Sequence, residues 1–130
     1  ADLRAMASAF RATLLSHPNA TPLFASRPAV TPGSLRYVEM GLSVLSDPFP
    51  DLAHRVQAFQ AVVAFIVGNA MLQLAPPAVN YRTLSEEAYP ILADVGRTLD
   101  DYTAQREFEF GLDAVIHGLA AMRDSAGSAR

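Results

Sequence analysis

The chain has 130 residues, of which 51% are hydrophobic, and its formal net charge is −3. This length suffices for one domain with a buried core and is short for two. All basic residues are arginine and they form no basic face, so direct binding of nucleic acid by this chain alone is not expected. The absence of cysteine excludes disulfides, thiolate metal ligands and thiol nucleophiles, and it fits the cytoplasmic location that we expect.

The N-terminal residues predict an amphipathic helix over residues 2–16. In this helix Arg4 and Arg11 lie opposite an apolar stripe of Leu3, Met6, Phe10 and Leu14. His17 and Pro18 end the helix, and the imidazole of His17 is expected to bond its last free carbonyl groups. The opening residues ADLRAMASAF have neither an initiator methionine nor a signal-peptide pattern, and they read as the middle of a helix. We therefore expect a chain cut from a longer protein.

Two threonine–proline pairs open the next helices. Thr21-Pro22 has the pattern of an N-cap followed by a first-turn proline, and it predicts a short helix that stops before Arg27. Thr31-Pro32 repeats the pattern and predicts a longer helix to about Ser46. Its apolar residues form two adjacent sectors, one of Leu35, Val38, Leu42 and Leu45, the other of Tyr37, Met40 and Val44. This apolar arc is wider than one helix contact requires.

The central helix, predicted from about Asp51 to Leu74, is the feature around which the other elements are arranged. Residues 56–74 are apolar on almost every side of a helix. Such a helix must be enclosed all round, and a small domain has few elements to enclose it, so we expect a second subunit to help. A membrane span is rejected because Gln60, Asn69 and Gln73 leave an uninterrupted apolar run of only about a dozen residues, whereas a bilayer requires about 20.

Two more helices are predicted after a proline pair at residues 76–77 and a loop to residue 83. The first starts at Ser85 or, because Pro90 lies too deep in a helix that starts there, nearer Tyr89, and it runs to about Asp100. The last runs over residues 104–123, and the polar tail after it is expected to fray. No segment shows the alternation of a strand. The fold class that follows is all-α.

The last helix carries a stripe of small residues beside its apolar stripe. Glycine inside a helix costs about 1 kcal/mol relative to alanine. Gly111 and Gly118 therefore indicate that another helix backbone approaches closely. That helix belongs either to the same subunit or to a partner.

Several short motifs occur in a specific order along the chain. The last helix contains Phe108-Glu109-Phe110-Gly111-Leu112-Asp113, followed by Gly118-Leu119. Upstream in the chain stand His17-Pro18, the block from Pro22 to Pro28, Leu35-Arg36 with Glu39, Leu42 and Leu45, and Gly68-Asn69-Ala70. In order and spacing these motifs resemble the C-terminal domain of the tetracycline-repressor (TetR) family of transcriptional regulators, and the resemblance covers essentially the whole chain.

The resemblance implies an all-helical sensor domain, with a helix-turn-helix DNA-binding domain expected before residue 1. It implies a repressor that releases operator DNA when a small, largely apolar effector binds. It also implies a homodimer formed by a four-helix bundle of the last and the central helices, with the interface residues Phe108, Gly111, Leu112, Val115, Gly118, Leu119 and Met122. The turn over residues 47–51 departs from the glycine-containing turn of many relatives. The alternative function is a stand-alone helical dimeric scaffold without a DNA partner.

Candidate effector contacts come from the helices that the resemblance implies around the ligand. Those able to line an apolar pocket are Met6, Phe10, Phe24, Tyr37, Met40, Phe59 and Val63, with Gln60 and Asn69 as polar anchors. The alternative for each is an ordinary core residue. Asn69 is the most informative, because an amide in an apolar helix is costly unless it is hydrogen-bonded. Its partner is a ligand or a second subunit, and the sequence does not choose between them.

The sequence has no motif for a metal site or for catalysis. His54 is isolated near a helix start and is expected to be solvated, and His117 follows Asp113 by one turn, which predicts a local hydrogen bond or ion pair. Scattered histidines without cysteines or spaced carboxylates make no metal signature. No nucleophile elbow, zinc-protease helix or phosphate-binding glycine loop occurs. We therefore expect no metal, no cofactor and no enzymatic activity.

Overall fold

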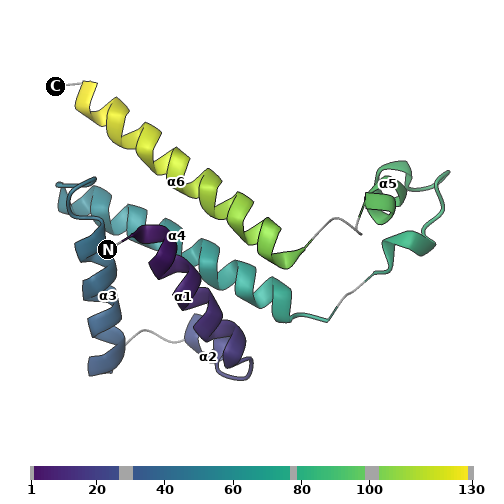
Figure 1. Ribbon diagram of the computed structural model, residues 1–130, viewed down its shortest axis with the longest axis horizontal. Helices are drawn as coiled ribbons and strands as arrows, with labels where there is room; N and C mark the ends of the chain where they lie inside the picture. The colour runs from purple at the N-terminus through teal and green to yellow at the C-terminus, as the bar shows by residue number, and fades with distance from the viewer. Residues whose placement is uncertain (1, 27–30, 77–78, 99–102, 129–130) are drawn as a thin grey trace.

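The computed structural model describes residues 2–26, 31–76, 79–98 and 103–128. None of these residues is in a strand, and the all-α prediction is confirmed. The helices are α1 (Leu3–Ser16), α2 (Thr21–Ser26), α3 (Pro32–Val44), α4 (Leu52–Leu74), α5 (Pro90–Thr98) and α6 (Ala104–Ser128), with a 3-10 turn η1 (Tyr81–Thr83) before α5. Helices α4 and α6 lie side by side and antiparallel, α1 packs on α4, and α5 lies with η1 beyond the end of α4 (Figure 1).

Helix α1 has a polar bond at each end. The carboxylate of Asp2 accepts a hydrogen bond from the backbone N–H of Arg4 at 3.0 Å, so Asp2 is the N-cap. This corrects the expectation that the sequence opens inside a helix. At the other end, Nδ1 of His17 donates to the carbonyl of Thr13 at 3.0 Å. The predicted capping role of His17 is confirmed.

Thr21 is the first residue of α2 and not its N-cap, which corrects the sequence prediction. Its buried hydroxyl donates to the carbonyl of Leu14 at 2.7 Å and lies 3.2 Å from the carbonyl oxygen of His17. Both carbonyl groups belong to the end of α1, where the last carbonyls lack partners within the helix. Thr21 therefore closes α1 and fixes α2 against it.

The predicted cap of α3 and the predicted start of α4 are confirmed. The Thr31 hydroxyl accepts from the backbone N–H of Ser34 at 3.2 Å, and the Ser34 hydroxyl accepts from the backbone N–H of Thr31 at 3.0 Å, which is a capping box. Helix α3 ends at Val44, slightly earlier than predicted. Asp51 caps α4 by accepting from the backbone N–H of His54 at 2.9 Å.

The boundaries of α5 and α6 differ in how well the sequence predicts them. Helix α5 begins at Pro90, which confirms the later of the two predicted starts, because proline suits the first helical position. Its predicted end, at about Asp100, lies outside the described residues. Helix α6 continues to Ser128, past the predicted end at Arg123. The predicted helix end is therefore too early, since no proline follows Arg123 to stop the helix. Fraying of the tail stays a prediction.

The main core lies between α1, α4 and α6. Its buried side chains are Ala7, Leu14, Val62, Ile66, Ala70, Phe108 and Leu112. A second cluster around the start of α4 contains Leu45, Phe49 and Ala58. On α1 the buried residues are Ala7, Arg11 and Leu14. Of the predicted stripe only Leu14 is buried, and Leu3, Met6 and Phe10 are half-buried. The small side chain of Ala7 permits the close approach of α4.

Much of the apolar surface of α4 stays uncovered by the rest of the chain. Only 28% of its most apolar 18-residue window is buried, and its overall length is 23 residues. Length and composition alone therefore permit a membrane span, which corrects the exclusion based on the apolar run. The core helix of a soluble protein meets the same criterion. Here α1, α2, α3 and α6 pack against α4, so it has the position of a core helix with one side open.

Candidate functional site

The core contains a buried cation, Arg11, which is only 7% exposed. It lies on the same face of α1 as Ala7 and Leu14, which are also buried. The prediction that Arg11 lies opposite the face of the helix that packs on the core is therefore wrong. The physical reason is that α4 and α6 present amide oxygens to this face, so the guanidinium finds acceptors inside the fold.

Four hydrogen bonds hold the guanidinium of Arg11. Nε donates to Oδ1 of Asn69 and Nη1 donates to Oε1 of Gln105, both at 2.9 Å. Nη2 donates to Oε1 of Gln73 at 2.5 Å and to the carbonyl of Ala104 at 3.1 Å. Arg11 thereby joins α1 to the last turns of α4 and the first turn of α6.

All of these acceptors are neutral. The ring of Phe108 adds a cation–π contact, with its centroid 4.5 Å from Cζ of Arg11. Among the described residues, no carboxylate forms an ion pair with Arg11. We call Arg11, Asn69, Gln73, Gln105 and Phe108 the Arg11 cluster. It carries a positive charge for which the described residues supply no counter-ion, an uncommon arrangement because buried charges are normally paired.

The structure brings together part of the predicted pocket. Phe10 of α1 and Phe24 of α2 meet edge to face, with ring centroids 5.4 Å apart. Phe59 of α4 lies against Gly41 of α3, where an added Cβ would be 2.4 Å from its ring. The other apolar candidates and Gln60 differ in exposure. The exposed ones are Tyr37, Met40 and Gln60, and the half-buried ones are Met6 and Val63. A ligand-binding role for any of them stays a prediction.

Asn69 has a partner that the sequence analysis did not include. The oxygen of its amide accepts from Arg11 of the same chain. The hydrogen bond that an amide in an apolar helix requires is therefore made within the subunit. A contact of Asn69 with a ligand or with a second subunit stays a prediction.

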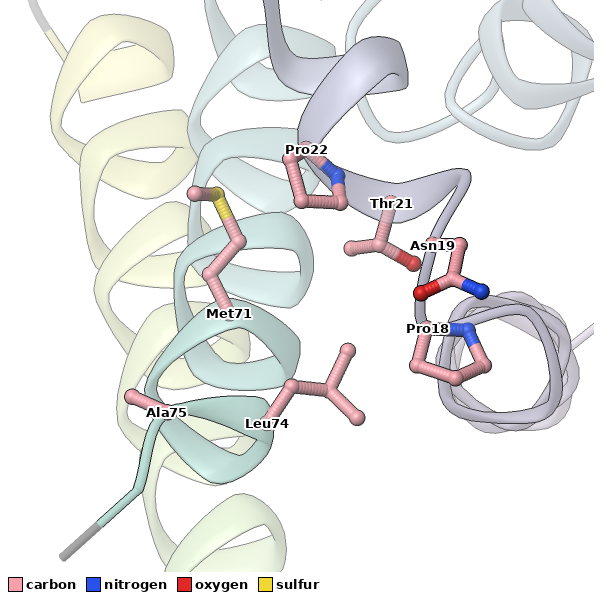
Figure 2. A pocket seen from close by; sticks show the side chains of 7 residues that line it. All are labelled: Pro18, Asn19, Thr21, Pro22, Met71, Leu74 and Ala75. Carbon is pink, nitrogen blue, oxygen red and sulfur yellow. The ribbon is translucent and has the colours of Figure 1, made fainter.

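A hollow of about 310 Å³ opens between the end of α4 and the α1–α2 connection (Figure 2). Figure 2 shows Met71, Leu74 and Ala75 on one side, with Pro18, Asn19, Thr21 and Pro22 on the other. None of the predicted pocket residues lines it. Its lining is mixed, with the polar side chains of Asn19 and Thr21 beside apolar ones.

A second hollow, of about 140 Å³, lies between the start of α1, the α3–α4 turn and α6. Its lining residues are Leu3, Leu45, Pro48, Phe49, Ile116, Leu119, Ala120 and Arg123. The guanidinium of Arg123 donates a hydrogen bond to the adjacent carboxylate of Asp124, which lowers the pKa of Asp124 below its ordinary value. This hollow, at about 140 Å³, is smaller than the roughly 300 Å³ at which ligand pockets of proteins typically begin.

The predicted dimer residues fall into two groups. Phe108 and Leu112 are buried in the core, and Gly111 lies against the ring of Phe65 of the same chain, 2.5 Å from where its Cβ would be. The close neighbour expected at Gly111 is thus an aromatic ring and not a helix backbone. The others reach the surface to different degrees, with Val115 and Leu119 half-buried and Gly118 and Met122 exposed. A Cβ on Gly118 would meet nothing within 4 Å in the described structure.

The histidines form local contacts. His54 is exposed, as expected, and its Nδ1 lies 2.9 Å from Oδ2 of Asp51. His117 donates from Nδ1 to the backbone carbonyl of Asp113 at 2.7 Å, while the carboxylate of Asp113 pairs with Arg4 of α1. The expected local hydrogen bond of His117 is confirmed. Within the described ranges, no group of histidine and carboxylate side chains is placed to hold a metal ion.

Sequence reasoning missed the Arg11 cluster, although one signal for it was present. Asn69 and Gln73 are four residues apart and therefore lie on one face of α4. Two amides on one face of an otherwise apolar helix indicate that a polar group from another helix packs between them. The identity of that group, Arg11, depends on how α1 crosses α4.

Comparison with known proteins gives one match. The family model described as "Tetracyclin repressor-like, C-terminal domain" matches residues 1–123. No curated protein and no solved structure matches the chain significantly.

Proposed function

The chain belongs to the family of tetracyclin repressor-like C-terminal domains, and from this premise we propose that it is the sensor and dimerisation part of a repressor. In this proposal a helix-turn-helix domain before residue 1 binds operator DNA, and a small, largely apolar effector releases it. The family is one of regulatory domains without catalytic activity. An effector releases DNA only if it binds the released state more tightly than the DNA-bound state, because equal affinity shifts no equilibrium.

The observation that supports dimerisation is the apolar surface left open on α4 and α6. Leu52 and Leu72 of α4 are exposed, as are Phe110 and Met122 of α6. A single folded subunit rarely leaves long apolar side chains so widely exposed on its two longest helices. A four-helix bundle made of α4 and α6 from two subunits would cover part of this surface, with Gly118 at the approach of the two α6 helices.

The dimer is tested by sedimentation velocity on the Gly118→Leu variant. The chain itself leaves open space at Gly118, so leucine fits the isolated subunit and is expected to hinder only a partner helix. We expect at least a tenfold weaker dimer, and unchanged helicity by circular dichroism. Gly118→Ala is the matched control and should dimerise almost normally. A dimer of Gly118→Leu as stable as the natural one would remove Gly118 from the interface.

The DNA-binding part of the proposal is tested in the gene. The coding DNA immediately before Ala1 should continue in frame for about fifty residues that encode two short helices joined by a turn. A stop codon, or a start methionine directly before Ala1, would contradict the repressor function. In that case a stand-alone dimeric scaffold would account for the fold.

A further inference from the structure

We propose that the hollow between the start of α1, the α3–α4 turn and α6 binds a small aromatic hydrocarbon, a single ring such as benzene or toluene. The hollow measures about 140 Å³, and every residue that lines it except Arg123 is apolar. An apolar cavity of about 150 Å³ in a protein core binds benzene. The hollow is therefore too small for a drug-sized molecule and large enough for one ring.

The floor of this hollow is held in place without a ligand. Leu45 is 2% exposed and Phe49 is 8% exposed. The backbone N–H of Phe49 donates to the carbonyl of Leu45 at 3.0 Å, and Arg55 donates to the carbonyls of Phe49 and Pro50, both at 2.9 Å. The α3–α4 turn is thus fixed by polar bonds. Because the walls are already in position, a ligand does not have to order them when it binds.

The charge and the aromatic group at the hollow favour an aromatic ring over an alkane or an anion. The guanidinium of Arg123 lines the hollow and would attract the negative face of a ring. Phe49 adds an aromatic wall, and pairs of rings gain more than their buried area alone supplies. An anion is disfavoured, because Arg123 already donates to the carboxylate of Asp124 at 2.7 Å and the other walls offer no hydrogen-bonding side chain.

The hollow touches the end of α1 that is held less firmly. Leu3, in the first turn, lines it, and the neighbouring Arg4 joins α6 only through an ion pair with Asp113 in which both side chains are 46% exposed. The other end of α1 is held by the four hydrogen bonds of Arg11 and by the buried hydroxyl of Thr21. A ring beside Leu3 would favour the position of this first turn that leaves the hollow open.

That first turn leads toward the DNA-binding domain that we propose before residue 1. The inference therefore rests on the proposed function and deepens it, because it names the chemical class of the effector and its site. None of the pocket residues predicted from the sequence lines this hollow.

The site is compatible with the proposed dimer. Leu119 lines the hollow, whereas Gly118 and Met122 do not. Adjacent residues of a helix point about 100° apart, because one turn contains 3.6 residues. A second α6 helix that approached at Gly118 would therefore leave the hollow open.

The first experiment measures thermal unfolding of the protein with toluene, with cyclohexane and with benzoate at constant ionic strength. We expect toluene to raise the melting temperature by roughly 5 °C at ten times its dissociation constant, with saturation. Cyclohexane should act more weakly and benzoate hardly at all. The absence of a saturable shift with toluene would overturn the proposal. An equal shift with cyclohexane or with benzoate would also overturn it.

The second experiment fills the hollow with a side chain. Ala120→Leu places three more carbon atoms at the lining, so we expect the toluene response to disappear. Ala9→Leu, an equal enlargement at an exposed position of α1 outside the hollow, is the matched control and should keep the full response. A full response in Ala120→Leu would overturn the proposal.

A third measurement uses the natural protein and does not depend on the folding of a variant. Toluene should slow amide hydrogen exchange at residues 6–8 of α1, which follow Leu3, and should leave α5 unchanged. Equal slowing in α5, or none in α1, would overturn the assignment of the site.

Failure of this inference and failure of the proposed function are distinguishable. A chain that dimerises and follows a DNA-binding domain but does not bind toluene would overturn the inference alone. A chain that binds toluene but follows no such domain would overturn the repressor function alone. Binding by these 130 residues that disappears when the preceding segment is present would mean that this segment fills the hollow, and it would overturn the effector site.

Discussion

The Arg11 cluster and the α5–η1 segment show two different ways in which this chain holds its elements together. Around Arg11, hydrogen bonds join side chains from three helices, and each nitrogen of the guanidinium has a partner. In α5 only Ala93 and Gly96 are buried, while Ile91 is 77% exposed. The core around Arg11 is therefore fixed by packing of side chains, whereas α5 is fixed mainly by one close approach of two backbones.

That close approach is at Gly96. A Cβ there would lie 2.8 Å from the backbone carbonyl carbon and oxygen of Tyr81, which cannot rotate away as a side chain could. Segments with few buried apolar contacts open locally at a lower free energy than the core. We therefore expect α5 and η1 to open before α1, α4 and α6. The following predictions test this difference between the two regions.

The largest effect is expected from Phe108→Ala. Phe108 is 1% exposed, stacks on Phe65 with ring centroids 5.7 Å apart, and lies under Arg11. Its loss removes apolar contacts and leaves a cavity, so we expect the free energy of unfolding to fall by about 3–5 kcal/mol. Urea denaturation followed by circular dichroism measures this.

The matched control for that change is Phe110→Ala on the same helix. Phe110 is 79% exposed, so its removal should change the free energy of unfolding of the separated subunit, measured below the dissociation constant of the dimer, by less than about 0.5 kcal/mol. If the two variants lost equal stability, α6 would not face the core with the side that the structure assigns to it. The difference in side-chain packing between the core and the α5–η1 segment would then have no support.

The sequence predicted those features of the fold that depend on neighbouring residues. Thr31 with Ser34, Asp51 at the start of α4, and Pro90 at the start of α5 act within one helical turn, so their chemistry can be read locally. The family resemblance, carried by the order of other short motifs such as that of Phe108 to Asp113, indicated the fold class, which the family match confirms.

The features that sequence reasoning missed are those that distant segments create together. Arg11 is buried because α4 and the start of α6 bring Asn69, Gln73 and Gln105 to it, across 58 to 94 residues of chain. Thr21 looks like a cap from its neighbours alone, yet its hydroxyl bonds to the previous helix. Gly111 carries no sign of whether a backbone or the ring of Phe65 approaches it. Such contacts depend on how helices cross, which local pattern does not specify.

A smaller and local effect is expected from Gly96→Ala. The added methyl group would collide with the Tyr81 backbone, so we expect the α5–η1 segment to lose about 1–3 kcal/mol of local stability. Amide hydrogen exchange should become faster over residues 81–98 and stay unchanged in the α1–α4–α6 core. Gly68→Ala on α4 is the control, because a Cβ there has open space and should stabilise the helix by up to about 1 kcal/mol. Faster exchange throughout the core would mean that α5 unfolds together with it.

The smallest effect is expected from Arg97→Gln in α5. Arg97 forms an ion pair with Asp94, and its Nη2 lies 3.5 Å from Oε1 of Glu86. The hydrogen bond and the charge of Asp94 raise the pKa of Arg97 above its ordinary value. A raised pKa stabilises the fold at every pH below the ordinary value and ceases to do so only in strong alkali, so Arg97 is charged at neutral pH.

Arg97 and both carboxylates are exposed, so water and dissolved salt weaken the attraction between their charges. We therefore expect Arg97→Gln to leave the midpoint of global unfolding unchanged and to speed amide exchange in α5 slightly at low ionic strength. At about 1 M salt, where the screening length falls to about 3 Å, the difference from the natural protein should vanish. A difference that persisted in high salt would mean that Arg97 holds α5 by packing of its aliphatic stem. The segment would then resemble the Arg11 cluster, where a buried arginine joins helices through contacts that dissolved salt screens little.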